Sequence, residues 1–440
     1  MINKLSFNIT FNKSEHNLCE INLKAGLHIV YGEGGIGKSF LMRALINDHK
    51  DNNSNFILSN IKIPKKRQII TQNPFNNIIG QTIKKDLAFG LECNSNDIKY
   101  INKKIKKLKK QLPFVVDWNL HPLNLSIGEM QVLNLVTAFS SKPDCVIIDN
   151  GLFYLSSTLK KEWANWMQSK ISSHMIILWL TSNYSDLKYG DNKWHLNLEN
   201  LQLIKINDYK IPYEKNFKEG QLSLDLREIY FSYKNTLKSK KVFNNLSFTV
   251  DKVRCFGIVG SNGSGKTTLS QLVAKIIDPD SGKISIKINQ SIPKVVILDQ
   301  LPENMYGGLS LHQLLTKIIY EKKIKKNKIE KIKKALLSFQ INWDLLKNIL
   351  IHKVSSSILR IALIVIFSHS DYELIILDEP TYGFGNKQKL GLNRFLKKTM
   401  SSKHIIIISH DIDFINNHCD AIFDLDKNNI FYNKHILING

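Results

Sequence analysis

Two stretches of this sequence decide its fold: Gly32-Glu-Gly-Gly-Ile-Gly-Lys38-Ser39 and Gly260-Ser-Asn-Gly-Ser-Gly-Lys266-Thr267. Each matches the pattern GxxxxGK[ST], in which a glycine-rich turn presents backbone N–H groups to phosphates and the lysine ammonium pairs with them. The two lysines are 228 positions apart. A second full match at a long, regular spacing indicates a duplicated unit rather than a chance motif.

Other polar residues recur at almost the same offset. The offset is 228 or 229 for four further pairs, which are Gln72 and Gln300, Ser126 and Ser355, Asp149 and Asp378, and Ser182 and His410. A length of 440 residues is enough for two domains that each bury a core. The sequence therefore predicts one domain at 1–205 and another at 222–440. The polar segment 206–221, with Pro212 and Gly220, is the predicted linker.

Apolar stretches in both halves end on polar motif residues. Leu27–Tyr31 and Cys255–Val259 run into the two P-loops, and each loop is followed by a predicted helix, at Phe40–Ile46 and Leu269–Ile277. Further strands are expected at 68–71, 145–148, 295–298, 374–377 and 405–408. Near-continuous apolar strands that alternate with helices are typical of a parallel sheet covered on both faces. The expected fold class is α/β, with two tandem P-loop domains, each a largely parallel sheet with flanking helices and an inserted helical subdomain.

Composition narrows the class of protein. The formal net charge is +23, but only six of the 61 basic residues are arginines, and proteins that recognise nucleic acid depend on the bidentate geometry of arginine. A nucleic-acid partner is therefore disfavoured. The lysine-dense stretches Lys103–Lys110 and Lys322–Lys334 have apolar residues at helical spacing. Solvated faces of amphipathic helices are favoured there over a specific anion-binding surface.

No apolar run reaches the length of a membrane-spanning helix, and the first residues lack the pattern of a signal peptide. The five scattered cysteines fit reduced thiols in a cytosolic protein. We therefore expect a chain in the cytosol or on the cytosolic side of a membrane.

With these motifs in order, almost the whole chain resembles the ATP-binding-cassette (ABC) ATPases. Each half has the family's sequence of P-loop, glutamine loop, signature, acidic strand end and switch-histidine position. Gln72-Asn-Pro74, followed by Gly80-Gln-Thr-Ile-Lys-Lys-Asp-Leu-Ala-Phe-Gly-Leu-Glu92, resembles the glutamine-loop region of the energy-coupling factor ATPases. The segment that starts at Gln300 is a looser relative of it.

The second half retains every chemical part of such a site. Lys266 is expected on the β- and γ-phosphates of ATP, and Thr267 and Asp378 on Mg²⁺. Glu379 can polarise the attacking water, and His410 can orient Glu379. Gln300 is expected to sense the metal ion, and Tyr233 resembles the aromatic residue that stacks on adenine. The expected nucleotide contacts in this half are Gly260, Asn262, Gly263, Ser264, Gly265, Lys266, Thr267, Thr268 and Tyr233.

The first half lacks two of these parts. Asn150 stands where the glutamate would follow Asp149, and Ser182 stands at the histidine position. An amide cannot act as a general base, so we expect nucleotide binding without efficient cleavage. Phe7 and Phe11 are both candidates for the adenine-stacking aromatic. The expected nucleotide contacts are Gly32, Gly34, Gly35, Gly37, Lys38, Ser39, Phe40 and Gln72, with Ser39 and Asp149 as metal ligands.

The signature motifs show the complementary pattern. Leu125-Ser126-Ile127-Gly128-Glu129 is nearly intact, whereas Val354-Ser355-Ser356-Ser357-Ile358 has lost both glycines. In the family, the signature of one domain faces the P-loop of the other, because the domains pair head to tail. The resemblance thus implies that Ser126 and Gly128 serve the complete second site, and that Ser355 serves the incomplete first one.

These observations predict the ATP-hydrolysing subunit of an importer resembling the energy-coupling factor transporters. It would lie on the cytoplasmic side of the cell membrane, bound to separate integral membrane subunits and without contact to the transported substrate. A soluble tandem ATPase that acts on ribosomes or nucleic acid is the alternative, supported by the basic charge. The short predicted linker and the unequal sites argue against it. A pair of domains that binds ATP without turnover is disfavoured by Glu379 and His410.

Overall fold

The computed structural model describes residues 4–11, 18–47, 55–93, 97–114, 117–206, 220–233, 240–306 and 308–433. The chain divides into two compact units, Met1–Tyr209 and Lys210–Gly440. Residues 207–219 of the predicted linker lie outside the described residues.

The first unit has a six-stranded sheet with the order β5-β6-β7-β3-β8-β9, in which only the edge pair β8–β9 is antiparallel. A separate antiparallel sheet has the order β2-β1-β4. The strands are β1 Leu5–Phe11, β2 Leu18–Leu23, β3 Gly26–Tyr31, β4 Phe56–Lys62, β5 Arg67–Ile70, β6 Cys145–Asp149, β7 Ile176–Thr181, β8 Asn192–Leu196 and β9 Leu201–Leu203. The helices are α1 Lys38–Asn47, α2 Ile83–Glu92, α3 Ile98–Lys109, α4 Ile127–Ser140 and α5 Ser157–Lys170, with short 3-10 turns at Pro74–Asn77, Pro122–Asn124 and Tyr184–Tyr189.

The second unit repeats this plan. Its six-stranded sheet has the order β14-β15-β16-β12-β17-β18, again antiparallel only at the edge pair β17–β18, and its second sheet has the order β11-β10-β13. The strands are β10 Leu222–Tyr233, β11 Lys240–Val253, β12 Cys255–Val259, β13 Ser281–Ile288, β14 Val295–Leu298, β15 Leu374–Asp378, β16 His404–Ile408, β17 Ala421–Asp424 and β18 Asn429–Tyr432. The helices are α6 Lys266–Val273, α7 Pro302–Tyr306, α8 Leu311–Tyr320, α9 Ile329–Ser338, α10 Trp343–Leu346, α11 Ser356–Ser368, α12 Asn386–Thr399 and α13 Ile412–His418, with 3-10 turns at Lys326–Lys328 and Ile351–Lys353. The predicted fold class is confirmed in both units.

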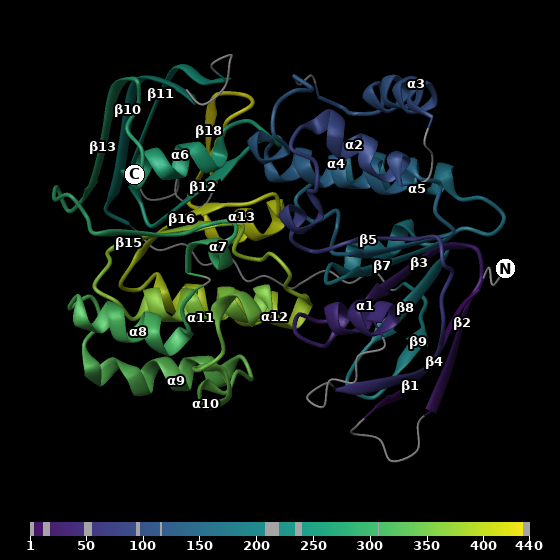
Figure 1. Cartoon of the computed structure of the whole chain (residues 1–440). Helices are drawn as coiled ribbons and strands as arrows, with labels where there is room; N and C mark the ends of the chain where they lie inside the picture. Colours follow the sequence, from purple (N-terminus) through teal and green to yellow (C-terminus); the bar gives the residue numbers. More distant parts are fainter. Residues whose placement is uncertain are drawn as a thin grey trace. The chain divides into compact units, whose positions relative to one another are not determined.

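Each parallel sheet is covered on both faces, as the apolar strands predict. Cys145 and Ile147 of β6 pack with α1 and the antiparallel sheet, whereas Val146 and Ile148 pack with helices α2–α4. This alternation follows from the two-residue period of a strand. In the second unit, helices α8–α11 form the corresponding layer, separate from the antiparallel sheet of β10, β11 and β13 (Figure 1). The P-loops, the glutamines and the acidic strand ends therefore collect at the carboxyl edge of each parallel sheet.

One predicted helix ends earlier than expected. We predicted Leu269–Ile277, but α6 ends at Val273. Lys275 has a left-handed φ of 57°, and the Ile276 N–H donates to the Gln271 carbonyl at 2.9 Å. This is a Schellman arrangement, which terminates a helix by satisfying its last carbonyls.

The two lysine-dense stretches differ in structure. Lys103–Lys110 lies on α3 and its C-cap, and Ile101, Ile105 and Leu108 are its buried positions. Lys322–Lys334 is not one helix, because residues 322–328 form a turn and a 3-10 segment before α9 begins at Ile329. In the described parts of the chain, no helix has both the length and the apolar character that a bilayer span requires.

Candidate functional site: two nucleotide-binding loops

Backbone geometry makes each P-loop a phosphate cradle. Gly35 and Gly263 both have a φ of 81°, and Gly37 and Gly265 have φ values of 114° and 98°. These left-handed conformations favour glycine, because a Cβ would be strained. At Gly265 a Cβ would also lie 2.7 Å from Val242. The loops lead into α1 and α6, whose first N–H groups can bind phosphate oxygens.

The P-loop lysines occupy matching positions. The Lys38 ammonium donates to the carbonyls of Gly32 and Glu33 at 2.7 and 2.8 Å, and Lys266 donates to those of Gly260 and Ser261 at 2.9 and 2.8 Å. Burial lowers the pKa of Lys38 to about 8. It also lowers the pKa of Lys266, partly offset by Glu379 and Asp378. A phosphate anion beside either ammonium would favour its charged form, so both loops have the chemistry to hold a triphosphate.

The expected metal ligands also meet in both units. The Thr267 hydroxyl donates to Asp378 Oδ2 at 2.8 Å, and the Ser39 hydroxyl donates to Asp149 Oδ2. Burial raises the pKa of Asp149, and burial with the nearby Glu379 and Asp299 carboxylates raises the pKa of Asp378 to about 7. Hydroxyl and carboxylate oxygens are ligands that Mg²⁺ prefers. Each pair can therefore hold a magnesium ion.

Glu379 is held at the centre of the second site. Its carboxylate accepts from the Ser409 hydroxyl at 2.9 Å and from the His410 N–H at 3.0 Å. His410 Nε2 lies 3.7 Å from Glu379 Oε1. Burial raises the pKa of Glu379 to about 7, against the lowering effect of Lys266 and these hydrogen bonds. Such a carboxylate is suited to accept a proton near neutral pH.

The first site has the same backbone hydrogen bond as the second site, but its side chains differ in chemistry. Asn150 Oδ1 accepts from the Ser182 N–H at 3.0 Å, the same bond that Glu379 makes with His410. The Thr181 hydroxyl is at the repeat position of Ser409, but it donates to Asp186 Oδ2 at 2.6 Å. An amide in place of the carboxylate leaves this site without a general base at that position.

The glutamines lie where the sequence predicts. Gln72 and Gln300 are partly buried and follow β5 and β14 within two residues. The Gln300 N–H donates to Asp299 Oδ1 at 2.5 Å, and its carbonyl accepts from Arg360.

The candidate adenine-binding aromatics differ between the units. Tyr233 is 41% exposed, its hydroxyl lies 3.1 Å from that of Thr268, and Phe231 packs edge-on against its ring. Phe7 and Phe11 are almost wholly buried in the core, so neither presents a face to a base. This excludes both of the alternatives that the sequence left open. Phe40 stands at the repeat position of Thr268, but it packs edge-on against Phe56 rather than beside a tyrosine hydroxyl.

The two signature serines cap their helices differently. Ser126 is the N-cap of α4 and forms a capping box with Glu129, with bonds of 3.3 and 2.8 Å. Gly128 is buried in the first turn. Ser355 is the N-cap of α11 without a side-chain cap bond. The pairing of each signature with the opposite P-loop stays a prediction.

Ser409 and Arg360 also belong to this site, although no sequence motif identified them. Ser409 adjoins the predicted His410, so its position could have suggested a role. Arg360 is fully buried and donates to the carbonyls of Asp378 and Glu379 at 3.3 and 3.2 Å. A single arginine in the apolar run Ile358–Phe367 was the available signal, because an arginine is almost never buried without a polar partner.

Comparison with known proteins agrees with this geometry. The family model for the ABC transporter matches residues 19–152 and 243–382, more than half of the chain. The chain therefore belongs to the ABC transporter family, as a tandem ATPase with ATP and Mg²⁺ as its cofactors. The resemblance drawn from the sequence is confirmed.

Relatives of known description cover one or both halves. A putative ABC transporter ATP-binding protein of Clostridium tetani is 22% identical, over 81% of this chain and 91% of the relative. A ribose import ATP-binding protein of the same organism is 25% identical, over 91% of this chain and 87% of the relative. An energy-coupling factor transporter ATP-binding protein of Thermotoga maritima is 28% identical, over 44% of this chain and 76% of the relative.

Solved structures share the fold. A model of ribosome-bound archaeal Pelota and ABCE1 contains a chain that aligns with a TM-score of 0.64 and 16% identity, over 95% of this chain and 76% of that one. RNase-L Inhibitor aligns with a TM-score of 0.57 and 15% identity, over 95% and 87%. Likeness at this level of identity shows the fold alone.

Proposed function

We propose that this chain is the ATP-hydrolysing subunit of a membrane importer similar to the energy-coupling factor transporters. It would work peripherally, on the cytoplasmic side of the cell membrane, with separate integral membrane subunits. ATP would close the two units head to tail, and hydrolysis would reopen them. The chain would not contact the transported substrate.

One competent and one degenerate ATP site are part of this proposal. The observation that carries it is the difference at one repeat position: the Glu379 carboxylate is bonded to Ser409 and His410, whereas Asn150 offers only an amide to Ser182. Hydrolysis then belongs to the second P-loop, completed by the nearly intact signature with Ser126. Binding without cleavage belongs to the first, where Lys38, Ser39 and Asp149 remain.

The transport role rests on two further supports. The glutamine-loop segment Gln72–Glu92 resembles that of energy-coupling factor ATPases, and one relative is such a protein over 76% of its length. Relatives that span both halves are described as ABC transporter and ribose import proteins.

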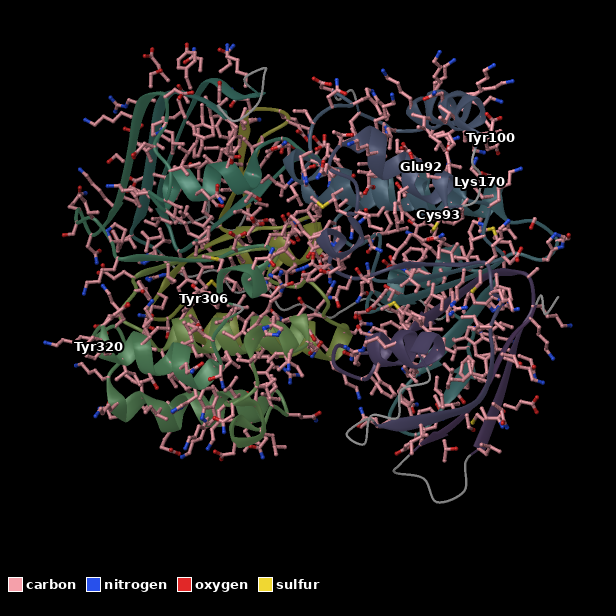
Figure 2. The ribbon with its side chains drawn as sticks, viewed as in Figure 1. Glu92, Cys93, Tyr100, Lys170, Tyr306 and Tyr320 are labelled. Carbon is pink, nitrogen blue, oxygen red and sulfur yellow. The ribbon has the colours of Figure 1, made fainter. Side chains whose placement is uncertain are left out.

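Exposed apolar side chains beside the glutamine loops mark the proposed partner surface. Ile79 is 61% exposed and Met305 is 46% exposed. Phe75 and Tyr306 also lie beside the glutamine loops, but they are only partly exposed and pack on their own cores. Tyr306 ends α7, beside the helical layer that contains α11 (Figure 2). Ile79 and Met305 are therefore the better probes.

A cavity of about 610 Å³ lies between α2 and α3, and its lining begins at Thr82, close to Ile79 in the sequence. Thr82, Ala88 and Glu92 line it from the side of α2, and Ile98 and Ile101 from the side of α3. Glu92 lies at the end of α2 (Figure 2). The rest of the lining is mostly polar and consists of Lys84, Lys85, Asn102, Ile105 and Asn119. We propose that this groove of the first unit receives a helix of the membrane partner.

The test is a purification of the Glu379→Gln variant with ATP from detergent-solubilised membranes and from the ribosomal pellet. We expect co-purification with integral membrane proteins. Ile79→Ser and Met305→Ser should reduce that association and leave ATP affinity unchanged. Ile57→Ser and Ile292→Ser are matched controls, because these residues are 49% and 73% exposed on other parts of the two units. Recovery with ribosomes and without membrane proteins would favour the alternative class.

A further inference from the structure

Arg360 is a charged group buried beneath the second nucleotide site. It lies on α11 and is 0% exposed. Its guanidinium donates to the carbonyls of Asp378, Glu379 and Gln300, and lies 5.0 Å from the centre of the Tyr382 ring. Among the described residues, no carboxylate oxygen forms a salt bridge with it. A buried charge is costly unless it is solvated by polar groups, and here main-chain carbonyls serve that role.

The carbonyls that Arg360 contacts belong to residues of the proposed catalytic site. Asp378 and Glu379 are the proposed metal ligand and general base, and Gln300 starts the glutamine loop. One side chain therefore ties together the ends of β14 and β15. Arginine is suited to this because its planar group presents several donors in a fixed arrangement.

Glu379 has a backbone conformation that needs such support. Its φ is 49°, in the left-handed region, which is uncommon for residues other than glycine, asparagine and aspartate. Its N–H donates to the Ile408 carbonyl at 2.8 Å, and its own carbonyl accepts from Tyr382 N–H at 3.1 Å and from Arg360 at 3.2 Å. These bonds fix the peptide from which the carboxylate projects.

The first unit provides an internal comparison. Asn150 has a φ of 50°, which asparagine tolerates better than glutamate does. Gln131 occupies the repeat position of Arg360, and its Oε1 accepts from the Tyr154 N–H at 3.0 Å. The guanidinium thus occurs in the unit that carries the strained glutamate, and a neutral amide occurs in the unit that carries asparagine.

We propose that Arg360 is a positioning residue for ATP hydrolysis: it holds the main chain of Asp378 and Glu379 so that the Glu379 carboxylate faces the attacking water. The proposal rests on the proposed function, in which Glu379 is the base of the competent site. Because Arg360 is fully buried, it would act through the main chain rather than through contact with the nucleotide. Its loss should change turnover and leave ATP binding intact.

The test is a double-mutant cycle between Arg360 and Glu379, measured as steady-state ATP hydrolysis. Arg360→Gln, which installs the residue of the first unit, should lower kcat about tenfold and leave the KM for ATP within about twofold. Arg360→Lys keeps the charge with fewer fixed donors, so it should recover part of the rate. In a Glu379→Gln background, Arg360→Gln should cause no further loss, because the group that it positions is gone.

Arg394→Gln is the matched control, since it removes an exposed arginine of the same unit and should leave kcat unchanged. Losses that multiply in the double variant would show that Arg360 acts independently of Glu379 and overturn the inference. If neither Arg360→Gln nor Arg360→Lys folds, as judged by thermal unfolding, Arg360 belongs to the stability of the fold and the inference is also wrong. Near-normal turnover of Glu379→Gln alone would instead refute the proposed function.

Discussion

The two halves of this chain have the same backbone at their nucleotide sites and different chemistry. Asn150 and Glu379 have φ values of 50° and 49°, and each side chain accepts a 3.0 Å hydrogen bond from the N–H of Ser182 or His410. The Asn150 amide accepts the same backbone hydrogen bond as the Glu379 carboxylate, but it cannot accept a proton from water. Nucleotide chemistry can therefore be lost while the local fold is retained.

A second contrast shows that the first unit has kept a packed network around its altered site. Lys160 pairs with the buried Asp186 at 3.2 Å, whereas Lys389, at the same repeat position, pairs with Asp411 at 2.6 Å. Asn183 stands at the repeat position of Asp411, so the lysine has exchanged one acidic partner for another. Because a buried ammonium without a partner is strongly destabilising, this exchange preserves the stability of the first unit.

The largest expected effect comes from the residue pair that separates the two sites. Glu379→Gln should reduce ATPase activity by about 10²–10⁴-fold, the usual contribution of a general base, and should preserve ATP binding. Asn150→Gln should change activity little, because the first site has no base to lose. Steady-state phosphate release and nucleotide-binding titrations measure both. Comparable losses in the two variants would contradict the assignment of hydrolysis to the second half.

The signature serines give the next largest difference. If the units pair head to tail, Ser126 of the first unit serves the nucleotide at Lys266. Loss of a charge-assisted hydrogen bond costs about 1.5–3 kcal/mol, or roughly ten- to a hundredfold in rate. Ser126→Arg should lower turnover by at least that factor, and Ser355→Arg by much less.

The control for this pair is Ser126→Thr, which keeps both the hydroxyl and the N-cap of α4 and should retain most of the activity. ATPase rates of the three variants are compared at saturating ATP. A larger loss from Ser355→Arg than from Ser126→Arg would invert the predicted arrangement of the sites.

The smallest expected effect concerns stability at acidic pH. The two halves have different residues at the first position of one strand. His404 begins β16, and Ile176 begins β7 at the same repeat position. Burial, with a contribution from Arg254, lowers the pKa of His404 to about 4. The unfolded chain takes up this proton below its ordinary pKa of about 6.5, so stability is lost as pH falls from there towards 4. At pH 5 the free energy of unfolding that is lost through His404 is at most about 2 kcal/mol.

His404→Ile should therefore flatten the pH dependence of the second unit. The variant loses the bond that Gln221 N–H donates to His404 Nε2 at 3.0 Å, which should cost about 1 kcal/mol at neutral pH. Amide hydrogen exchange of β16 at pH 7.5 and pH 5 measures this effect for the strand itself. An unchanged difference between the two pH values would assign the acid sensitivity to other groups, such as His418, where burial also lowers the pKa to about 4.

Much of the molecule follows from local sequence patterns. The predicted strands Cys255–Val259 and Val295–Leu298 match β12 and β14, because uninterrupted β-branched and apolar runs bounded by polar residues allow few other structures. The P-loops follow from their glycines, which accept φ values of 81° to 114° without the strain that a Cβ would add. The end of α6 was wrong by four residues, since a left-handed lysine terminated the helix where no glycine or proline marked the stop.

The sequence by itself determined the duplication, the family and the loss of Glu379 and His410 equivalents in the first half, because residue identity and spacing along the chain specify them. Only the tertiary structure decided that Phe7 and Phe11 lie in the core and that Thr181 turns to Asp186. Only the structure also placed Arg360 beneath three carbonyls that stand up to 79 residues away from one another in the chain. These are contacts between segments distant in sequence, and they depend on how a parallel sheet brings the ends of its strands to one edge.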